Sequence, residues 1–171
     1  MLSKTERLIL INQYEILRKM DDDEWNKDYY AQTIRALEYG FGGEYWQPFE
    51  RLNSESLSQE DCAHAKDILE MFWMMEPAYD RLTPKPAVAE SDVRFRGFDG
   101  NNESMYCAYV DFLRKNGQFA EILSERATNS HMRTMRRYDA MLARWKELGK
   151  PLADTFTAVE IEEVIKAGQA S

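Results

Sequence analysis

The most hydrophobic stretch of the chain is Asp67–Met75, in which seven of nine residues are apolar. A helix that is apolar almost all round must be covered by its neighbours. The pattern therefore predicts an all-α fold wrapped around a central helix at about residues 59–76. Ser58, followed by acidic residues in the first turn, is the expected N-cap. Pro77 is expected to kink or stop the helix.

Helical periodicity recurs on both sides of this segment. Ser3 with Glu6, and Thr157 with Glu160, have the spacing of capping boxes, which predicts a helix start at each place. The sequence contains no internal repeat, and a length of 171 residues suits one domain. We therefore expect a single multihelical domain over residues 1–171. Besides the central helix, the spacing of apolar residues predicts helices at about 3–20, 25–39, 45–52, 101–115 and 130–148, and a last one from Thr157.

Two segments do not follow helical spacing. Residues 83–92 contain two prolines among small residues, which predicts an extended linker. The next residues are expected to continue as extended chain, packed on the core through Val93, Phe95 and Phe98. Residues 118–130 remain open between a short helix and a polar connection.

Composition and charge narrow the class of protein. The chain of 171 residues is 44% hydrophobic and carries a net charge of −8. Such a balance is typical of a globular protein and argues against a general nucleic-acid binder, which needs a basic surface. Cys62 and Cys107 are too few for a disulfide framework, which favours a reducing compartment. With no signal-peptide pattern and no long apolar span, we expect a cytoplasmic protein with no membrane association.

One basic segment departs from the acidic balance. Seven basic and two acidic residues lie between Arg126 and Lys150. Most simply, the basic residues of the helix expected at about 130–148 form a solvated surface and pair with acids elsewhere in the chain. The alternative interpretation is a module that binds RNA or phosphate through the basic face of the helix at 130–148. Its candidate binding residues are Arg133, Arg136, Arg137 and Arg144.

Aromatic residues are dense between Trp25 and Phe49. Some must belong to the core, but tyrosine and tryptophan beside a glycine-rich turn also suit a subunit interface. The favoured partner is therefore a second copy of the chain, in a homo-oligomer that is most simply a dimer. The candidate interface residues are Tyr39, Phe41, Tyr45 and Trp46.

Candidates for catalysis are weaker. Glu70 interrupts the apolar run of the central helix and is the acid expected to be buried, where it would either pair with arginine or have a shifted pKa. A thiol–imidazole pair would need Cys62 or Cys107 to meet His131 in the fold. No local pattern predicts a metal site or a cofactor, so we predict no catalytic residue, and the enzyme hypothesis ranks last.

A set of short segments, in order along nearly the whole chain, matches a known family pattern. The segments are Arg7–Leu10 with Asn12–Tyr14, Asp67–Met71, Gly97–Asp99, Tyr106, Tyr109, Phe112, Tyr138, Met141, Leu142, Trp145, Ala158, Glu160, Ile161 and Ile165. Together they resemble the YfbU family. The resemblance implies a multihelical fold, a cytoplasmic location and self-association, but no reaction and no catalytic residues. The sequence therefore predicts a non-enzymatic oligomeric protein that interacts with itself or with an unknown protein partner.

Overall fold

The computed structural model describes residues 2–45, 49, 52–123 and 128–170. These residues contain eight α-helices and no strand, apart from one isolated parallel bridge between Phe98 and Asn129. The expected all-α class is confirmed. The helices are α1 (Lys4–Met20), α2 (Glu24–Tyr39), α3 (Gln59–Arg81), α4 (Glu90–Val93), α5 (Ser104–Lys115), α6 (Ala120–Leu123), α7 (Met135–Glu147) and α8 (Ala158–Gln169).

The chain groups into two compact units, Met1–Ser54 and Glu55–Ser171. They are called the N-terminal unit and the C-terminal unit below, and each is described by itself. The expectation of one domain over the whole chain stays a prediction. The helix expected at 45–52 lies mostly outside the described residues.

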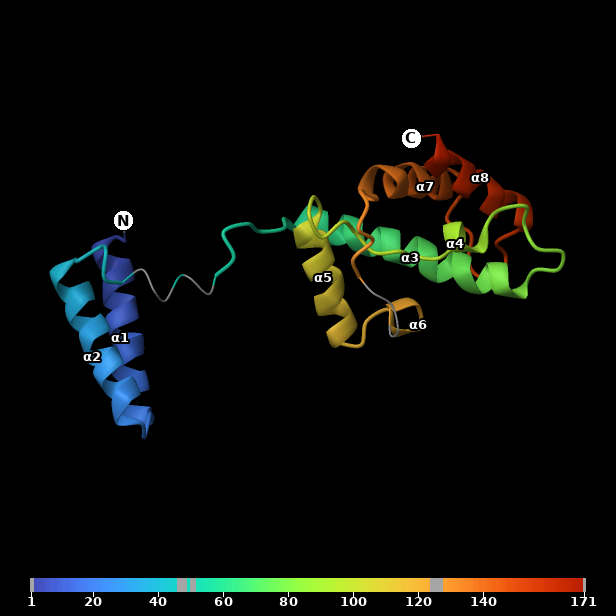
Figure 1. Cartoon of the computed structure of the whole chain (residues 1–171). Coiled ribbons are helices and arrows are strands. Elements are labelled where there is room, and N and C mark those ends of the chain that lie inside the picture. The colour runs from blue at the N-terminus through green and yellow to red at the C-terminus, as the bar shows by residue number, and fades with distance from the viewer. Residues whose placement is uncertain (1, 46–48, 50–51, 124–127, 171) are drawn as a thin grey trace. The chain divides into compact units, whose positions relative to one another are not determined.

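The N-terminal unit is a hairpin of α1 and α2, whose ribbons lie side by side (Figure 1). Ser3 begins α1 with the predicted capping box, and the Asp23 carboxylate accepts hydrogen bonds from the first backbone amides of α2. Gly40, with a φ of 76°, ends α2 in the left-handed region that glycine tolerates. The local chemistry of each helix end therefore defines the hairpin.

The hydrophobic core of this hairpin is small. Its buried cluster consists of Ala36, Leu37 and Tyr45. Not one residue of α1 is fully buried. The helix packs on α2 only through residues that stay partly exposed, which include Leu10, Ile11 and Tyr14.

The C-terminal unit is built on α3, which begins after Ser58, the predicted N-cap, and Ser58 forms a capping box with Asp61. The helix extends to Arg81, five residues beyond the expected end, although Pro77 lies inside it. Ala78 and Tyr79 are buried after the proline, and this burial offsets the hydrogen bond that the proline removes. The central apolar helix is confirmed, and its buried residues are Ala65, Ile68, Leu69, Met71, Phe72, Met75, Glu76, Ala78 and Tyr79.

Helices α7 and α8 pack against each other and against α3 (Figure 1). Their contact is close, because a side chain at Gly168 would collide with Met141. The predicted capping box at Thr157 begins α8. The inward faces of the two helices are formed by Tyr138, Met141, Leu142, Trp145, Ile161, Val164 and Ile165.

Two predicted helix starts are wrong by a few residues. The helix expected from 101 begins at Ser104, because Asp99 instead closes a turn by accepting hydrogen bonds from Asn101 and Asn102. The helix expected from 130 begins at Met135, since His131 lies in the left-handed region with a φ of 56°. The ambiguous segment 118–130 contains the short helix α6 among its described residues.

The expected linker is irregular from 83 to 89 and then forms the single turn of α4. It continues to Arg96 as extended chain, and residues 83–96 are called the strap below. Val93, Phe95 and Phe98 are buried, as predicted. The strap is joined by hydrogen bonds both to α3 and to α7 and α8.

Candidate functional site

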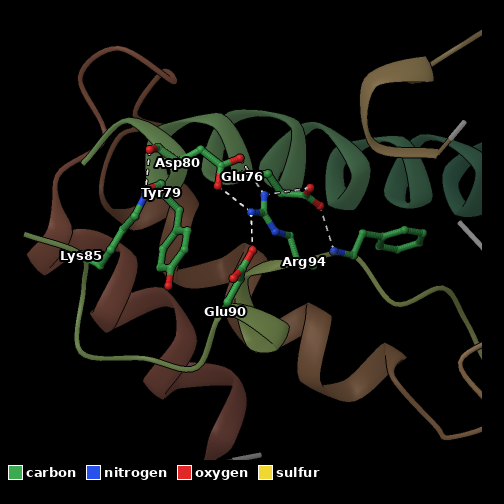
Figure 2. A network of polar contacts seen from close by, with 7 residues as sticks. Glu76, Tyr79, Asp80, Lys85, Glu90 and Arg94 are labelled. Atoms are coloured by element: carbon green, nitrogen blue, oxygen red, sulfur yellow. Dashed lines mark hydrogen bonds and ion pairs between the residues drawn. The ribbon is translucent and has the colours of Figure 1, made fainter. Parts of the chain in front are cut away.

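Arg94 fastens the end of the strap to the last turns of α3 (Figure 2). Its guanidinium donates two hydrogen bonds to the Asp80 carboxylate, at 2.5 and 2.9 Å. It lies 2.7 Å from the Glu90 carboxylate and 3.6 Å from that of Glu76. The hydrogen bond to Asp80, helped by the one to Glu90, raises the pKa of Arg94 above its ordinary value. At the other end of the strap, the Lys85 ammonium donates to the backbone carbonyls of Tyr79 and Asp80.

The buried acid of α3 is Glu76, not Glu70. The Glu76 residue is 4% exposed, and its carboxylate accepts a 2.9 Å hydrogen bond from the Phe95 amide of the strap. Glu70 is partly exposed. A buried carboxylate that is paired with arginine and a backbone amide holds the strap in place, which is an architectural role. The sequence signal was present, because Glu76 follows Phe72 by one helical turn on the same buried stripe.

Most of the basic face of α7 is already paired with acids. Arg137 lies 3.0 Å from Asp92, and Arg144 lies 2.6 Å from Glu163 of α8. Lys146 contacts Asp67 of α3. These pairs match the simpler interpretation of the face, in which it is neutralised by acids elsewhere in the chain.

The N-terminus of α7 is also occupied, since the Glu103 carboxylate accepts hydrogen bonds from the Thr134 and Met135 amides at 3.0 and 2.9 Å. An added anion would meet that charge. Arg133 donates to the Asn102 side chain. Arg136 is exposed, and its side chain makes no hydrogen bond or ion pair to the part of the chain that the structure describes. The structure thus does not gather the four candidate arginines around a free binding site.

The thiols and imidazoles do not form a reactive pair among the described residues. The Cys107 thiol donates to the Thr128 carbonyl oxygen at 3.3 Å, whereas His64 lies 2.7 Å from the Asp139 carboxylate. Cys62 is a free, partly buried thiol, and His131 is exposed. Within the described ranges no group of three or more potential ligands could hold a metal ion.

The shifted pKa values that bear on catalysis have structural causes. Burial, with a hydrogen bond to Asp61, raises the pKa of Tyr106 to about 12. The hydrogen bond from the Ser58 hydroxyl, followed by that of Tyr106, lowers the pKa of Asp61. Burial likewise raises the pKa of Tyr138 to about 12. These groups cap a helix or bridge elements, so their shifts need no catalytic explanation.

The candidate interface residues differ in their exposure to solvent. Tyr39 and Phe41 are 73% and 56% exposed, and their rings stack with centroids 5.4 Å apart. Tyr45 is only 4% exposed and belongs to the core of the N-terminal unit, so it cannot meet a partner as expected. Trp46 lies outside the described residues.

Sequence reasoning missed the most exposed hydrophobic residues of the N-terminal unit. Trp25 is 75% exposed and stacks on Tyr29. The signal was a helix with apolar residues beyond the single stripe that one neighbour can cover. The exposed large hydrophobic residues of α1 are Leu8, Ile9, Ile16, Leu17 and Met20.

Together these features define an all-α protein with a closed core around one helix and uncovered hydrophobic surface on an N-terminal hairpin. Residues 1–167 match the family model described as the YfbU domain, so the chain belongs to the YfbU family. It is 29% identical over 170 residues to a protein of Actinobacillus succinogenes described as "UPF0304 protein", covering 97% of this chain and 99% of that protein. The resemblance noted in the sequence is confirmed. Over its described residues, the structure has no helix long and apolar enough to cross a bilayer.

Proposed function

We propose that the chain is a non-enzymatic protein that self-associates through its N-terminal unit. One observation carries the proposal: each helix of the hairpin exposes large hydrophobic side chains, so either helix offers a surface for a second copy, while the buried cluster of the unit holds three residues. Large hydrophobic side chains exposed together on one small unit are typical of an interaction surface. The free cysteines and the paired acids fit a cytoplasmic protein without assembled catalytic chemistry.

The size of the unit supports the same conclusion. A two-helix hairpin of 54 residues can bury only a modest part of its surface by itself. Domains as small as this unit often bury their remaining hydrophobic surface by oligomerisation. A dimer is the simplest assembly, because one patch then covers its own copy.

Sedimentation velocity from low to high micromolar concentration tests the proposal. We expect a concentration-dependent shift from monomer to dimer. Ile16→Lys together with Trp25→Lys places charge on both uncovered faces of the hairpin and should weaken association by at least about tenfold. Val159→Lys, at a hydrophobic residue of α8 that is 65% exposed, is the matched control and should associate as the unmodified chain does. A strict monomer at high micromolar concentration contradicts the proposal.

A second candidate, RNA or phosphate binding, rests on the exposed guanidinium of Arg136 and on its neighbour Arg133. Binding of a single-stranded RNA should then fall steeply with salt and be lost in Arg133→Glu with Arg136→Glu. The paired acids around the rest of α7 favour the first proposal. RNA binding that those substitutions leave unchanged would reject this candidate.

A further inference from the structure

The outer face of α2 carries a row of exposed residues with heptad spacing. From the first residue the steps are three, four, three and four, so all members lie on one stripe of the helix. Each member is exposed. This row is called the α2 seam, and it consists of Trp25, Asp28, Gln32, Arg35 and Tyr39.

The chemistry of the α2 seam is symmetric about its midpoint. Gln32 stands at the centre, with an acid one step before it and a base one step after it. An aromatic residue closes each end, and each is extended by a stacked ring, Tyr29 beside Trp25 and Phe41 beside Tyr39. The Asp28 and Arg35 side chains form no hydrogen bond or ion pair with another residue that the structure describes. Such a row is complementary to itself when it is reversed.

We infer that the α2 seam binds the α2 seam of a second copy in antiparallel orientation, with the twofold axis at Gln32. The inference rests on the proposed self-association and names its surface. Asp28 then faces Arg35 of the second copy, and the symmetry repeats this contact. The aromatic end at Trp25 meets the aromatic end at Tyr39 of the second copy. The seam spans about 21 Å, since fourteen helical steps of ~1.5 Å separate its first residue from its last.

Charge complementarity favours a second copy of the α2 seam as the partner, and it favours the antiparallel orientation. A twofold interface brings a patch against itself, so it requires the self-complementary order that the α2 seam has. In parallel pairing, Asp28 would face Asp28 and the acidic turn at Asp21–Asp23 would face its own copy, with like charges opposed. The exposed row of α1, which includes Ile9 and Ile16, is uncharged and does not distinguish one apolar partner from another.

Charge reversal gives a sharp test in the full-length chain. Asp28→Lys places two basic residues opposite each other, and Arg35→Glu places two acids opposite each other. Each variant alone should self-associate at least about tenfold more weakly than the unmodified chain. Mixed in equal amounts, the two variants should form a heterodimer, because both contacts again join opposite charges. The double variant, Asp28→Lys with Arg35→Glu, should recover self-association.

Glu38→Lys is the matched control, since it changes the net charge as Asp28→Lys does at an exposed α2 position outside the seam. It should associate normally. Circular dichroism checks that each variant keeps its helical content. If the unmodified chain is a monomer, the proposed function itself fails. If it dimerises but both single variants dimerise equally well, or the mixture forms no heterodimer, the seam inference alone is overturned. Loss of dimer in Ile16→Lys, with the seam variants unaffected, would assign the interface to α1 instead.

Discussion

The two compact units of this chain bury hydrophobic surface in different ways. In the C-terminal unit, α3 is enclosed by α7, α8 and the strap, and Phe72 is completely buried against Phe95 and Tyr138. In the N-terminal unit, α1 has one neighbour and keeps Leu8 and four further large hydrophobic residues exposed. The difference shows that a helix needs several neighbours to cover an extended apolar surface, and that the hairpin lacks them within its own unit.

The polar contacts differ in the same way. In the N-terminal unit, the caps join residues two or three positions apart, such as Ser3 with Glu6. In the C-terminal unit, contacts such as Glu76 with Phe95 and Arg137 with Asp92 join distant parts of the chain. Long-range polar contacts therefore join several elements of the C-terminal unit, whereas in the hairpin the Arg7 guanidinium makes such a contact between α1 and α2, by donating to the Leu37 carbonyl oxygen.

Phe72→Ala should have the largest effect on stability. It removes a ring with no exposed surface from the centre of the C-terminal core and should lower the free energy of unfolding by about 3–5 kcal/mol. Leu8→Ala, at a residue that is 58% exposed, should change it by less than about 0.5 kcal/mol. Native-state hydrogen exchange of the α3 and α1 amides measures the two units separately. Equal effects of the two substitutions would contradict the comparison.

Arg94→Met should have the next largest effect, because it leaves the buried Glu76 carboxylate without its cation and frees the strap from Asp80. We expect a loss of about 1–3 kcal/mol, measured by urea denaturation. Arg96→Met is the control within the same segment. Its exposed ion pair with Asp92 should contribute at most about 1 kcal/mol. An equal loss in both variants would show that the network of Figure 2 does not hold the strap.

Local features of the fold could be predicted from the sequence, and long-range ones could not. The capping boxes at Ser3, Ser58 and Thr157 depend on residues three apart, and each begins a helix as expected. The predicted start of α7 was wrong because His131 takes a left-handed conformation and the first amides of the helix bind Glu103, which lies 31 residues earlier in the chain. No local pattern reveals such a partner.

The candidate sites follow the same rule. Glu70 drew attention because it interrupts an apolar run, but burial of an acid depends on what packs over it. The strap covers Glu76 and leaves Glu70 partly exposed. The exposure of Tyr39 and Phe41 agreed with an interface, whereas Tyr45 turned inward. Hydrophobic periodicity does not predict the α2 seam, because three members of the seam are polar.

Tyr138→Phe should produce a smaller loss that depends on pH. The hydroxyl donates to the Gly97 carbonyl oxygen and accepts from the Arg96 amide, so its removal should cost about 1–2 kcal/mol near pH 8. Burial raises the pKa of Tyr138 to about 12, above its ordinary value of 10. Between these values the unfolded chain releases the proton and the folded chain keeps it, so the stability contribution is full below pH 10 and is lost as pH rises toward 12.

Phenylalanine has no proton to lose, and the difference between the two proteins should therefore shrink by about 1 kcal/mol at pH 11. Urea denaturation of both proteins at pH 8 and pH 11 measures this change. Lysines and the other tyrosines titrate alike in both proteins and cancel in the comparison. A difference that stays constant would show that Tyr138 titrates at its ordinary pKa.

The smallest expected effect is that of Ile16→Gln on the dilute monomer. Ile16 is about half exposed on α1, so its replacement removes little buried surface and should change the free energy of unfolding by less than about 0.5 kcal/mol. The measurement is a urea titration at submicromolar protein, where association is negligible, repeated at high micromolar concentration. If α1 stays uncovered in the dimer, as pairing through the α2 seam requires, the effect should remain equally small at both concentrations. A loss that grows with concentration would mean that a second copy buries Ile16, because stabilisation by self-association increases with protein concentration. The substitution at Ile16 therefore distinguishes an interface on α1 from one on α2, and it does so without changing the charge of the hairpin.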